Sequence, residues 1–304
     1  MQNEAALTDV IQRQLESGNA ELPVFNPIAQ RIQKETACEE PDFHLIEQLI
    51  VKDPALASEV LKMANSSVYR GLTEVTSIRN AIVRLGANEV ANIVTLVTHE
   101  NNFRSRDPFM HKIMRKLWGH SLACAVGSQL IAQKSGLLEL AQEAFLAGLL
   151  HDIGKLLIIK IIDDVLSSKQ MPIHFSASLL EDALDRLHTE CGYTLMAQWN
   201  LPGQYVEIAR DHHEDKYDIK NLLLVIVRLV NNACRKMGLG LRHDPSIALI
   251  MTTEFQLLNL NDLDKPLNRN LLDEQWKDFF RWKWQWLSHK YTTSNLGTWF
   301  PEHK

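Results

Sequence analysis

Five histidines and one aspartate are the residues of this sequence best suited to chemistry. In chain order they are His120, His151, Asp152, His188, His212 and His213. A divalent ion needs several lone pairs that converge within about 2.0–2.6 Å, and imidazole and carboxylate groups suit iron, manganese, nickel and zinc. We interpret these six residues as candidate ligands of one divalent transition metal (Fe, Mn, Ni or Zn).

Each of these histidines also has a purely structural interpretation. A single histidine in an apolar helix is more often a hydrogen-bonded core residue than a ligand, and His188 alone would be interpreted in that way. His212 and His213 are followed by Glu214 and Asp215, which also fits a solvated helix end. The metal interpretation therefore depends on the joint pattern, in which these residues fall at helix positions that could face one cavity.

The densest part of the pattern reads Gly-Leu-Leu-His-Asp-Ile-Gly-Lys over residues 148–155. Adjacent residues on a helix point about 100° apart, so His151 and Asp152 can serve one ion from a helix end, or two neighbouring ions. Lys155, one turn after His151, is placed to neutralise a phosphate oxygen. In such a site the metal activates water and clamps a phosphoryl group. Asp152 and Lys155 are therefore the candidate catalytic residues if the protein is an enzyme.

The elements that must position these residues are predicted to be helices, because helical periodicity runs through nearly every segment and strand-like alternation is scarce. Asp53 before Pro54 is a good helix start, Ser77 can cap the next helix, and Gly86 is placed to end it. His120 falls in an expected helix that ends near Ser135, His151 at the end of one at about 137–150, and His188 within one at 178–199. His212 and His213 end the helix that starts after Pro202, and a further apolar helix is expected at 222–237.

The composition limits the classes of function. The chain has 304 residues, 45% of them apolar, and a net charge of −5, which argues against nucleic acid as a partner held by bulk charge. The N-terminus lacks the basic start and apolar core of a signal peptide. The apolar run 222–230 is interrupted by Arg228 and is too short to cross a bilayer. We therefore expect a cytoplasmic protein with no membrane association.

Two further residue types bear on the interpretation. The four cysteines, at 38, 124, 191 and 234, are expected to be buried free thiols in a reducing compartment rather than disulfides. Five of the seven tryptophans lie in the last fifty residues, at 276, 282, 284, 286 and 299. Docking of this segment on the core is favoured over a protein interface, and base stacking is the least favoured interpretation.

The order of several short motifs resembles a known family. The N-terminal half carries Asp-Pro-Ala-Leu at 53–56, Asn-Ser-Ser at 65–67 and Ser-Ile-Arg-Asn-Ala-Ile at 77–82. The second half carries His120-Ser121, the segment 147–155, Glu181 ahead of His188, Trp-Asn-Leu-Pro at 199–202, and His212-His213. Over roughly residues 20–250 this pattern resembles the HD superfamily of metal-dependent phosphohydrolases and, more specifically, the HDOD domain, a bacterial signalling relative of HD-GYP domains.

The resemblance implies an all-α fold with an N-terminal helical bundle packed on an HD-like helical bundle. The expected organisation is an N-terminal helical extension at 1–19, an N-terminal HDOD subdomain at 20–108, an HD-like subdomain at 109–252 and a tryptophan-rich helical extension at 253–304. Asn65, Ser66 and Ser67 are expected to end a helix or start a turn rather than to bind a ligand.

The resemblance also shows where this sequence departs from active HD-GYP relatives. Their glutamate one turn before the first histidine corresponds here to Lys116, and their distal aspartate corresponds to Asn231. The segment after His213 lacks the Gly-Tyr-Pro signature. The favoured expectation is therefore a non-catalytic regulatory module in bacterial signal transduction, with a protein partner and a nucleotide or phosphate ligand. The alternative is a metal-dependent phosphohydrolase, acting as a phosphodiesterase or nucleotide phosphatase.

Overall fold

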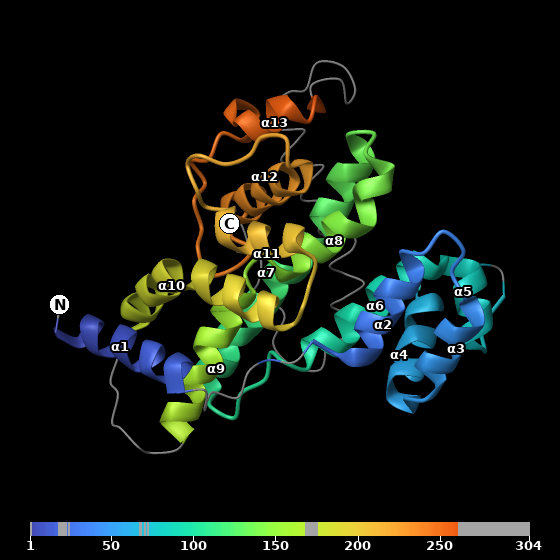
Figure 1. Ribbon diagram of the computed structural model, residues 1–304, viewed down its shortest axis with the longest axis horizontal. Coiled ribbons are helices and arrows are strands. Elements are labelled where there is room, and N and C mark those ends of the chain that lie inside the picture. The colour runs from blue at the N-terminus through green and yellow to red at the C-terminus, as the bar shows by residue number, and fades with distance from the viewer. Residues whose placement is uncertain are drawn as a thin grey trace, which may run out of the picture. The chain divides into compact units, whose positions relative to one another are not determined.

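The computed structural model describes residues 2–17, 23, 25–66, 69, 71, 73–167 and 176–260, and every regular element in these ranges is a helix. The expectation of an all-α fold is confirmed (Figure 1). The described residues divide into two compact units. Unit 1 takes those of Met1–Phe25 and His99–Leu260, and unit 2 takes those of Asn26–Thr98. All six candidate ligands belong to unit 1.

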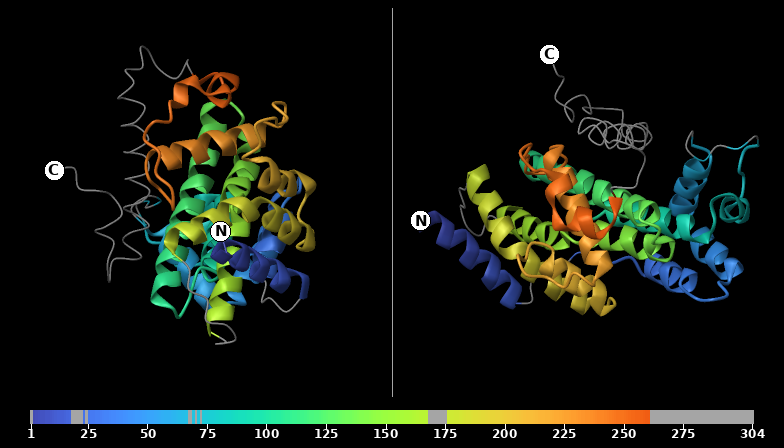
Figure 2. Two further views of the ribbon diagram at one scale, coloured as in Figure 1. Left: turned by 90° about the vertical axis from the view of Figure 1, so that its left-hand side faces the viewer. Right: turned by 90° about the horizontal axis from the view of Figure 1, so that it is seen from above.

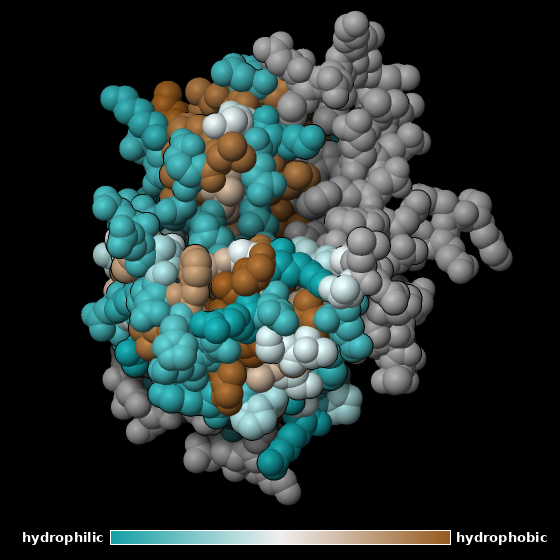
Figure 3. Space-filling model, turned by 90° about the vertical axis from the view of Figure 1, so that its right-hand side faces the viewer, coloured by the Kyte–Doolittle hydropathy of each residue, from teal (hydrophilic) through white to brown (hydrophobic). Residues whose placement is uncertain are grey.

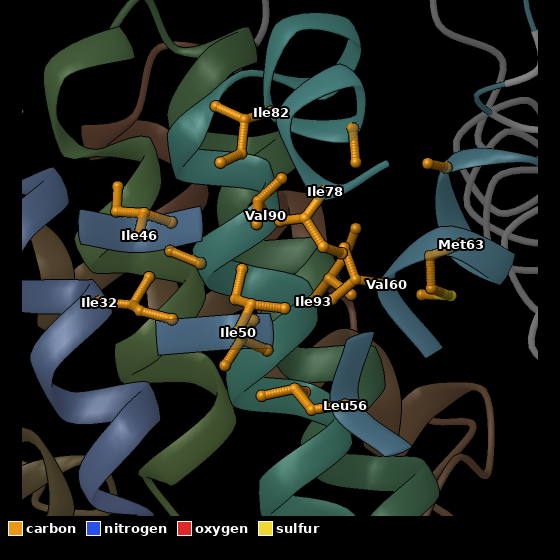
Figure 4. Packing of buried hydrophobic residues seen from close by; sticks show 14 of the residues in the cluster. Ile32, Ile46, Ile50, Leu56, Val60, Met63, Ile78, Ile82, Val90 and Ile93 are labelled. Carbon is orange, nitrogen blue, oxygen red and sulfur yellow. The ribbon is translucent and has the colours of Figure 1, made fainter. Parts of the chain in front are cut away.

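Unit 2 is a small helical bundle with its own apolar core. Its helices are α2 (Pro27–Thr36), α3 (Phe43–Val51), α4 (Pro54–Ala64), α5 (Ile78–Leu85) and the greater part of α6 (Ala87–Glu100). Each helix turns one apolar stripe inward. The core in Figure 4 contains Ile32, Ile46, Ile50, Leu56, Val60, Met63, Ile78, Ile82, Val90 and Ile93.

Local polar chemistry explains where the helices of unit 2 begin and end. The Asp53 carboxylate accepts hydrogen bonds from the Ala55 and Leu56 amides at 3.0 and 3.1 Å. The Ser77 hydroxyl accepts one from Asn80 at 3.2 Å. Gly86 ends α5 with a φ of 81°, which favours glycine. These three predicted helix boundaries are confirmed.

Asn65 has a structural role at the end of α4. Its side-chain amide donates to the Val75 carbonyl and its carbonyl accepts from the Val75 amide, both at 2.8 Å. The pair of bonds closes the loop between α4 and α5. The interpretation of Asn65 as a residue that ends a helix is therefore confirmed. Ser67 lies outside the described residues.

Unit 1 is built around one long helix. Its helices are α1 (Gln2–Ser17), α7 (Pro108–Lys134), the short 3₁₀ turn η1 (Leu138–Leu140), α8 (Ala141–Leu150), α9 (Ile153–Ser167), α10 (Ala177–Gln198), α11 (Gly203–Asp211), α12 (Leu222–Lys236), η2 (Leu249–Met251) and α13 (Thr253–Leu257). Helix α7 packs against α8 and α12, and α10 packs against α9 and α11 (Figures 1 and 2). These contacts bring the helices that carry the candidate ligands together.

Two glycines allow the close helix packing on either side of His151 and Asp152. A Cβ at Gly148 would overlap the Cys124 carbonyl of α7 and lie 2.7 Å from the Ser128 hydroxyl oxygen. A Cβ at Gly154 would overlap the His188 carbonyl of α10 and lie 2.6 Å from the Gly192 amide nitrogen. Real Cβ atoms do not approach backbone this closely, so any side chain at either position would push α8 or α9 away from its neighbour.

One predicted helix differs from the structure. The helix expected over 137–150 begins only at Ala141, because the segment before it forms the 3₁₀ turn η1. Gly136, with a φ of 75°, turns the chain after α7. The 3₁₀ turn at Leu138–Leu140 then leads into α8. The tryptophan-rich segment with Trp276, Trp282, Trp284, Trp286 and Trp299 lies outside the described residues.

Two further observations concern the surface and the hydropathy of the helices. The face in Figure 3 is predominantly hydrophilic, with hydrophobic residues scattered among the polar ones. No described helix is by itself long and apolar enough to cross a membrane. Helices α5 and α6 reach that length and hydropathy only when taken together, across a bend of 116°.

Candidate metal centre

The Asp152 carboxylate is the meeting point of four histidines from different helices. His120 comes from the middle of α7, His151 from the junction of α8 and α9, His188 from α10 and His212 from the end of α11. Their Nε2 atoms lie 3.2, 3.5, 3.5 and 3.4 Å, respectively, from a carboxylate oxygen of Asp152. All five side chains are buried. We call these five residues the His/Asp centre.

The hydrogen bonds of the four Nδ1 atoms indicate which nitrogen of each neutral ring carries the proton. The Nδ1 atoms of His120, His151, His188 and His212 lie 2.7–3.0 Å from the carbonyl oxygens of Leu239, Gly148, Leu184 and Ala209. A carbonyl oxygen only accepts hydrogen bonds, so in each neutral ring Nδ1 carries the proton and donates. The Nε2 lone pairs are therefore left free, and all four face the carboxylate. Metal-binding histidines are commonly held in this way.

This arrangement brings several hydrogen-bond acceptors close together without donors between them. The Nε2 atoms of His188 and His212 lie only 3.4 Å apart. Within the described part of the chain, His151 Nε2 and Asp152 Oδ1 are buried without a hydrogen-bond partner. A buried polar atom without a partner is costly, and one cation between these atoms would satisfy them together. The donor set of imidazole nitrogens and a carboxylate fits a divalent transition metal.

The electrostatics of His151 and His188 favour neutral rings beside an ionised carboxylate. Burial, followed by the charge of Lys155, lowers the pKa of His188 to about 3. Burial also lowers the pKa of His151 well below its ordinary value, although Asp152 opposes this. Burial alone would raise the pKa of Asp152, but Lys155 and His151 outweigh it and hold that pKa well below its usual range. Neutral imidazole and ionised carboxylate are the forms that bind metals.

The centre opens onto a cavity of about 210 Å³. His213 lines this cavity, and its ring centroid lies 4.2 Å from that of His212. The cavity wall also carries three cations and three anions, namely Lys155, Arg235, Arg242, Asp152, Glu181 and Asp185. Arg242 forms an ion pair with Asp185, while the Arg235 Nε atom is buried without a partner among the described residues. The wall thus offers hydrogen-bond donors to an anionic ligand.

The structure brings together all seven residues predicted for the site. Asp152, His213 and Lys155 share the cavity with His120 and His188, while His151 and His212 contact Asp152 from within the core. The Lys155 ammonium lies 2.7 Å from Asp152 Oδ2, so its first partner is the carboxylate. Groups of these residues are close enough to bind one ion: Asp152 with His188, His212 and His213, or with His120 and His151.

Asn231 and Lys116, the two positions that depart from active HD-GYP relatives, differ in whether they line the cavity. Asn231 of α12 is buried and lines the cavity, so it can offer a neutral amide there. Lys116 of α7 is half-buried and is not among the residues that line the cavity. The charge of Lys116 therefore does not face a bound ion directly.

Several residues that build the site have no recognisable signal in the sequence. The Leu239 carbonyl accepts a hydrogen bond from His120, 119 positions away in the chain. Gly240 follows it with a φ of 136°, and a Cβ at this position would lie only 3.1 Å from His120 Nδ1. Arg228 of α12 donates to the carbonyls of Asp211, His212 and Glu214 at 2.8–3.3 Å. Its guanidinium therefore holds the turn that presents His212 and His213.

Comparison with known proteins agrees with this geometry. The model of the HDOD domain matches residues 22–215. The chain belongs to the HDOD family. An HDOD protein of unknown function from Geobacter sulfurreducens has the same fold, with a TM-score of 0.69 at 20% identity over 90% of this chain and 94% of its own.

Two further solved structures share the HDOD fold. A proposed metal-dependent phosphohydrolase from Shewanella amazonensis SB2B gives a TM-score of 0.62 at 19% identity, over 86% of this chain and 98% of its own. A proposed signal transduction protein from Marinobacter aquaeolei VT8 gives 0.65 at 22% identity, over 94% of this chain and 65% of its own. At such identities the likeness concerns the fold.

A curated relative, an uncharacterized protein from Treponema pallidum (strain Nichols), is 26% identical over 192 residues, or 60% of this chain. The match covers 36% of that relative, so this chain spans only about a third of its length.

Proposed function

We propose that this HDOD protein is a regulatory module of a bacterial signalling pathway. Its His/Asp centre would hold one divalent transition metal, and the adjoining cavity would take a phosphate-bearing ligand such as a nucleotide. The observation that supports this proposal best is the convergence of four histidine Nε2 atoms on the Asp152 carboxylate. A cation stabilises such a site because it satisfies the converging acceptors, so the site is suited to ligand binding.

The charges around the cavity favour a phosphate ligand once a metal is present. The three cations and three anions of the wall balance one another, so a divalent ion gives the cavity a net positive charge. When bound, such an ion attracts phosphate oxygens and lowers the pKa of a water ligand. Arg235 and Lys155 can donate hydrogen bonds to the remaining oxygens, and Arg suits phosphate through its fork of donors.

A ligand at this centre would also act on the packing of unit 1. The centre takes side chains from α7, the α8–α9 junction, α10 and α11, so an ion or phosphate that binds them together favours one arrangement of these helices. Ligand binding that distinguishes two helix arrangements is the physical basis of a switch. A protein partner that recognises one arrangement would then transmit the signal.

The first experiment is the metal content of protein purified without chelators or a metal-affinity step, by elemental mass spectrometry. We expect Asp152→Ala to contain about one equivalent less of Fe, Mn, Ni or Zn than the wild type, because that carboxylate is the common neighbour of the four rings. Asp182→Ala, an exposed carboxylate on α10, is the matched control and should retain the metal. Equal metal content in Asp152→Ala and the wild type would contradict the proposed centre.

A phosphate titration of the metal-loaded protein tests the second half of the proposal. Inorganic phosphate should bind by calorimetry, and Arg235→Gln should weaken it while the metal content stays unchanged. Phosphate binding that does not depend on Arg235 or on the metal would place the ligand elsewhere.

A metal-dependent phosphohydrolase is the second candidate, favoured by the retention of the five histidines and Asp152 together with Lys155 in the cavity wall. The test is turnover of phosphomonoesters, phosphodiesters and nucleotides with Mn, Fe, Mg or Ni. Turnover that requires Asp152 would establish an enzyme. Metal and phosphate binding without turnover would leave the regulatory function.

A further inference from the structure

A second group of metal-binding atoms lies beside the His/Asp centre. Cys124 Sγ lies 3.6 Å from His120 Nε2 and 3.7 Å from Cys234 Sγ, and both cysteines are fully buried. Cys124 lies one helical turn after His120 on α7, and Cys234 lies almost one turn after Asn231 on α12. Two of the helices that line the cavity, α7 and α12, therefore also bring two thiols together.

The distances match the edges of a tetrahedral thiolate site. With Zn–S bonds of about 2.3 Å and Zn–N bonds of about 2.0–2.1 Å, tetrahedral geometry separates two sulfurs by about 3.8 Å and sulfur from nitrogen by about 3.5–3.6 Å. The observed separations are 3.7 and 3.6 Å. The ligand atoms of His120, Cys124 and Cys234 all lie within 4.8 Å of one another. Two of the three edges therefore already match a tetrahedral site, and the three ligand atoms are close enough to share one ion.

We propose that His120, Cys124 and Cys234 form a separate site for a thiophilic cation such as Zn²⁺. Thiolates select softer ions than the carboxylate of Asp152 does, so the two sites differ in the metal they prefer. This proposal does not depend on the function proposed above. His120 and Asn231 line the cavity, which provides a route by which an ion can approach the thiols from solvent.

His120 connects the two sites. Its Nε2 atom lies 3.2 Å from Asp152 Oδ2 and 3.6 Å from Cys124 Sγ, and it has a single lone pair with which to bind an ion. An ion on the thiols therefore removes His120 from the His/Asp centre, which then retains His151, His188, His212 and Asp152. A thiophilic metal would in this way weaken the binding of a second ion at Asp152.

Binding at this site requires the thiols to lose their protons. Burial, and then the neighbouring Cys234, raises the pKa of the Cys124 thiol well above its ordinary value. Without a metal, the Cys124 thiol therefore keeps its proton and donates a weak S–H contact to Cys234 Sγ at 3.7 Å. A cation that binds both sulfurs displaces these protons to solvent.

Titration of the reduced, chelator-treated full chain with Cd²⁺ tests the proposal, because thiolate coordination produces an ultraviolet charge-transfer band. We expect a band that saturates near one equivalent in the wild type and in Asp152→Asn, which disables only the His/Asp centre. Cys124→Ser and Cys234→Ser should lose most of the band. Cys191→Ser, a buried cysteine on α10, is the matched control and should keep it.

Two outcomes would overturn the proposal. One is the absence of a band in the reduced wild type, which would leave the thiols as a packed S–H pair. The other is a band that persists in a Cys124→Ser, Cys234→Ser double variant. If the serine variants fail to fold, mass-mapped alkylation of the wild type in mild denaturant decides instead. Cadmium should then protect Cys124 and Cys234 but not Cys191, and equal labelling of all three would refute the site.

Discussion

His99 should make this protein sensitive to mild acid, through a mechanism outside the His/Asp centre. The ring lies near the end of α6, buried against Phe103 and Trp118 at centroid distances of 5.3 and 6.2 Å. Both ring nitrogens are buried without a hydrogen-bond partner among the described residues. Burial lowers the pKa of His99 to about 4. The native state therefore holds this ring neutral at pH values where the unfolded chain protonates it.

The sign and size of the effect follow from the two pKa values. The unfolded pKa is about 6.5, so the contribution of His99 to stability is fully present above that pH. Because the unfolded state binds a proton first, this contribution is lost as the pH falls from about 6.5 to about 4. At about 1.36 kcal/mol for each pKa unit, the whole loss is about 3 kcal/mol.

Urea unfolding at a series of pH values, with the wild type and His99→Phe compared in a chelator, measures this loss. The difference in unfolding free energy between the two proteins should shift by about 3 kcal/mol in favour of the variant between pH 7 and pH 4. His111→Phe replaces an exposed histidine on α7 and should give a difference that does not change with pH. Parallel stability curves for the wild type and His99→Phe would refute the argument.

Two further substitutions test the packing and the positioning of the centre. Gly154→Ala should destabilise unit 1 by about 1–3 kcal/mol or more, because the new Cβ overlaps the His188 carbonyl. A Cβ at Gly192 would lie 3.4 Å from both the Ala209 Cβ and the Gly154 amide nitrogen, which are ordinary contact distances, so Gly192→Ala should be neutral or stabilising. Thermal unfolding compares the two, and equal melting temperatures would contradict the close approach. Arg228→Gln should lower metal affinity about 10-fold or more, since Arg228 pairs with Glu254 at 2.8 Å while it holds the turn at His212. Arg210→Gln removes an exposed pair with Asp211 and should leave the affinity unchanged, and a similar loss in both variants would argue against a positioning role.

The parts of the fold that could be predicted from the sequence depend on local chemistry. Asp53 and Ser77 cap helices through hydrogen bonds to amides two or three residues away, and Gly86 ends a helix through its own backbone angle. The histidines and Asp152 could be identified as candidate ligands for a similar reason, because imidazole and carboxylate side chains bind metals whatever their surroundings. The helical pattern was not sufficient to place the start of α8, because the segment before it forms a 3₁₀ turn instead.

The remaining parts of the site depend on contacts between segments far apart in the chain. Arg228 looks like an interruption of an apolar run, and its role exists only because the end of α11 turns three carbonyls toward it. Arg235 and Arg242 are ordinary surface residues by type, and only the fold places them in the cavity wall. Cys124 and Cys234 are 110 residues apart, so no spacing rule could pair them.

The direction of the histidine lone pairs separates a ligand from a core residue, and most of that direction is local. His151, His188 and His212 each donate Nδ1–H to a carbonyl three or four residues earlier, so helix geometry alone turns their Nε2 atoms away from their own backbone. His99 has no such bond among the described residues and remains a buried core residue. His120 differs from both, because its Nδ1 depends on the distant Leu239 carbonyl. The ring held by a tertiary contact is also the one placed between Asp152 and Cys124, which makes the loop at Leu239 and Gly240 the element that can decide which of the two sites His120 serves.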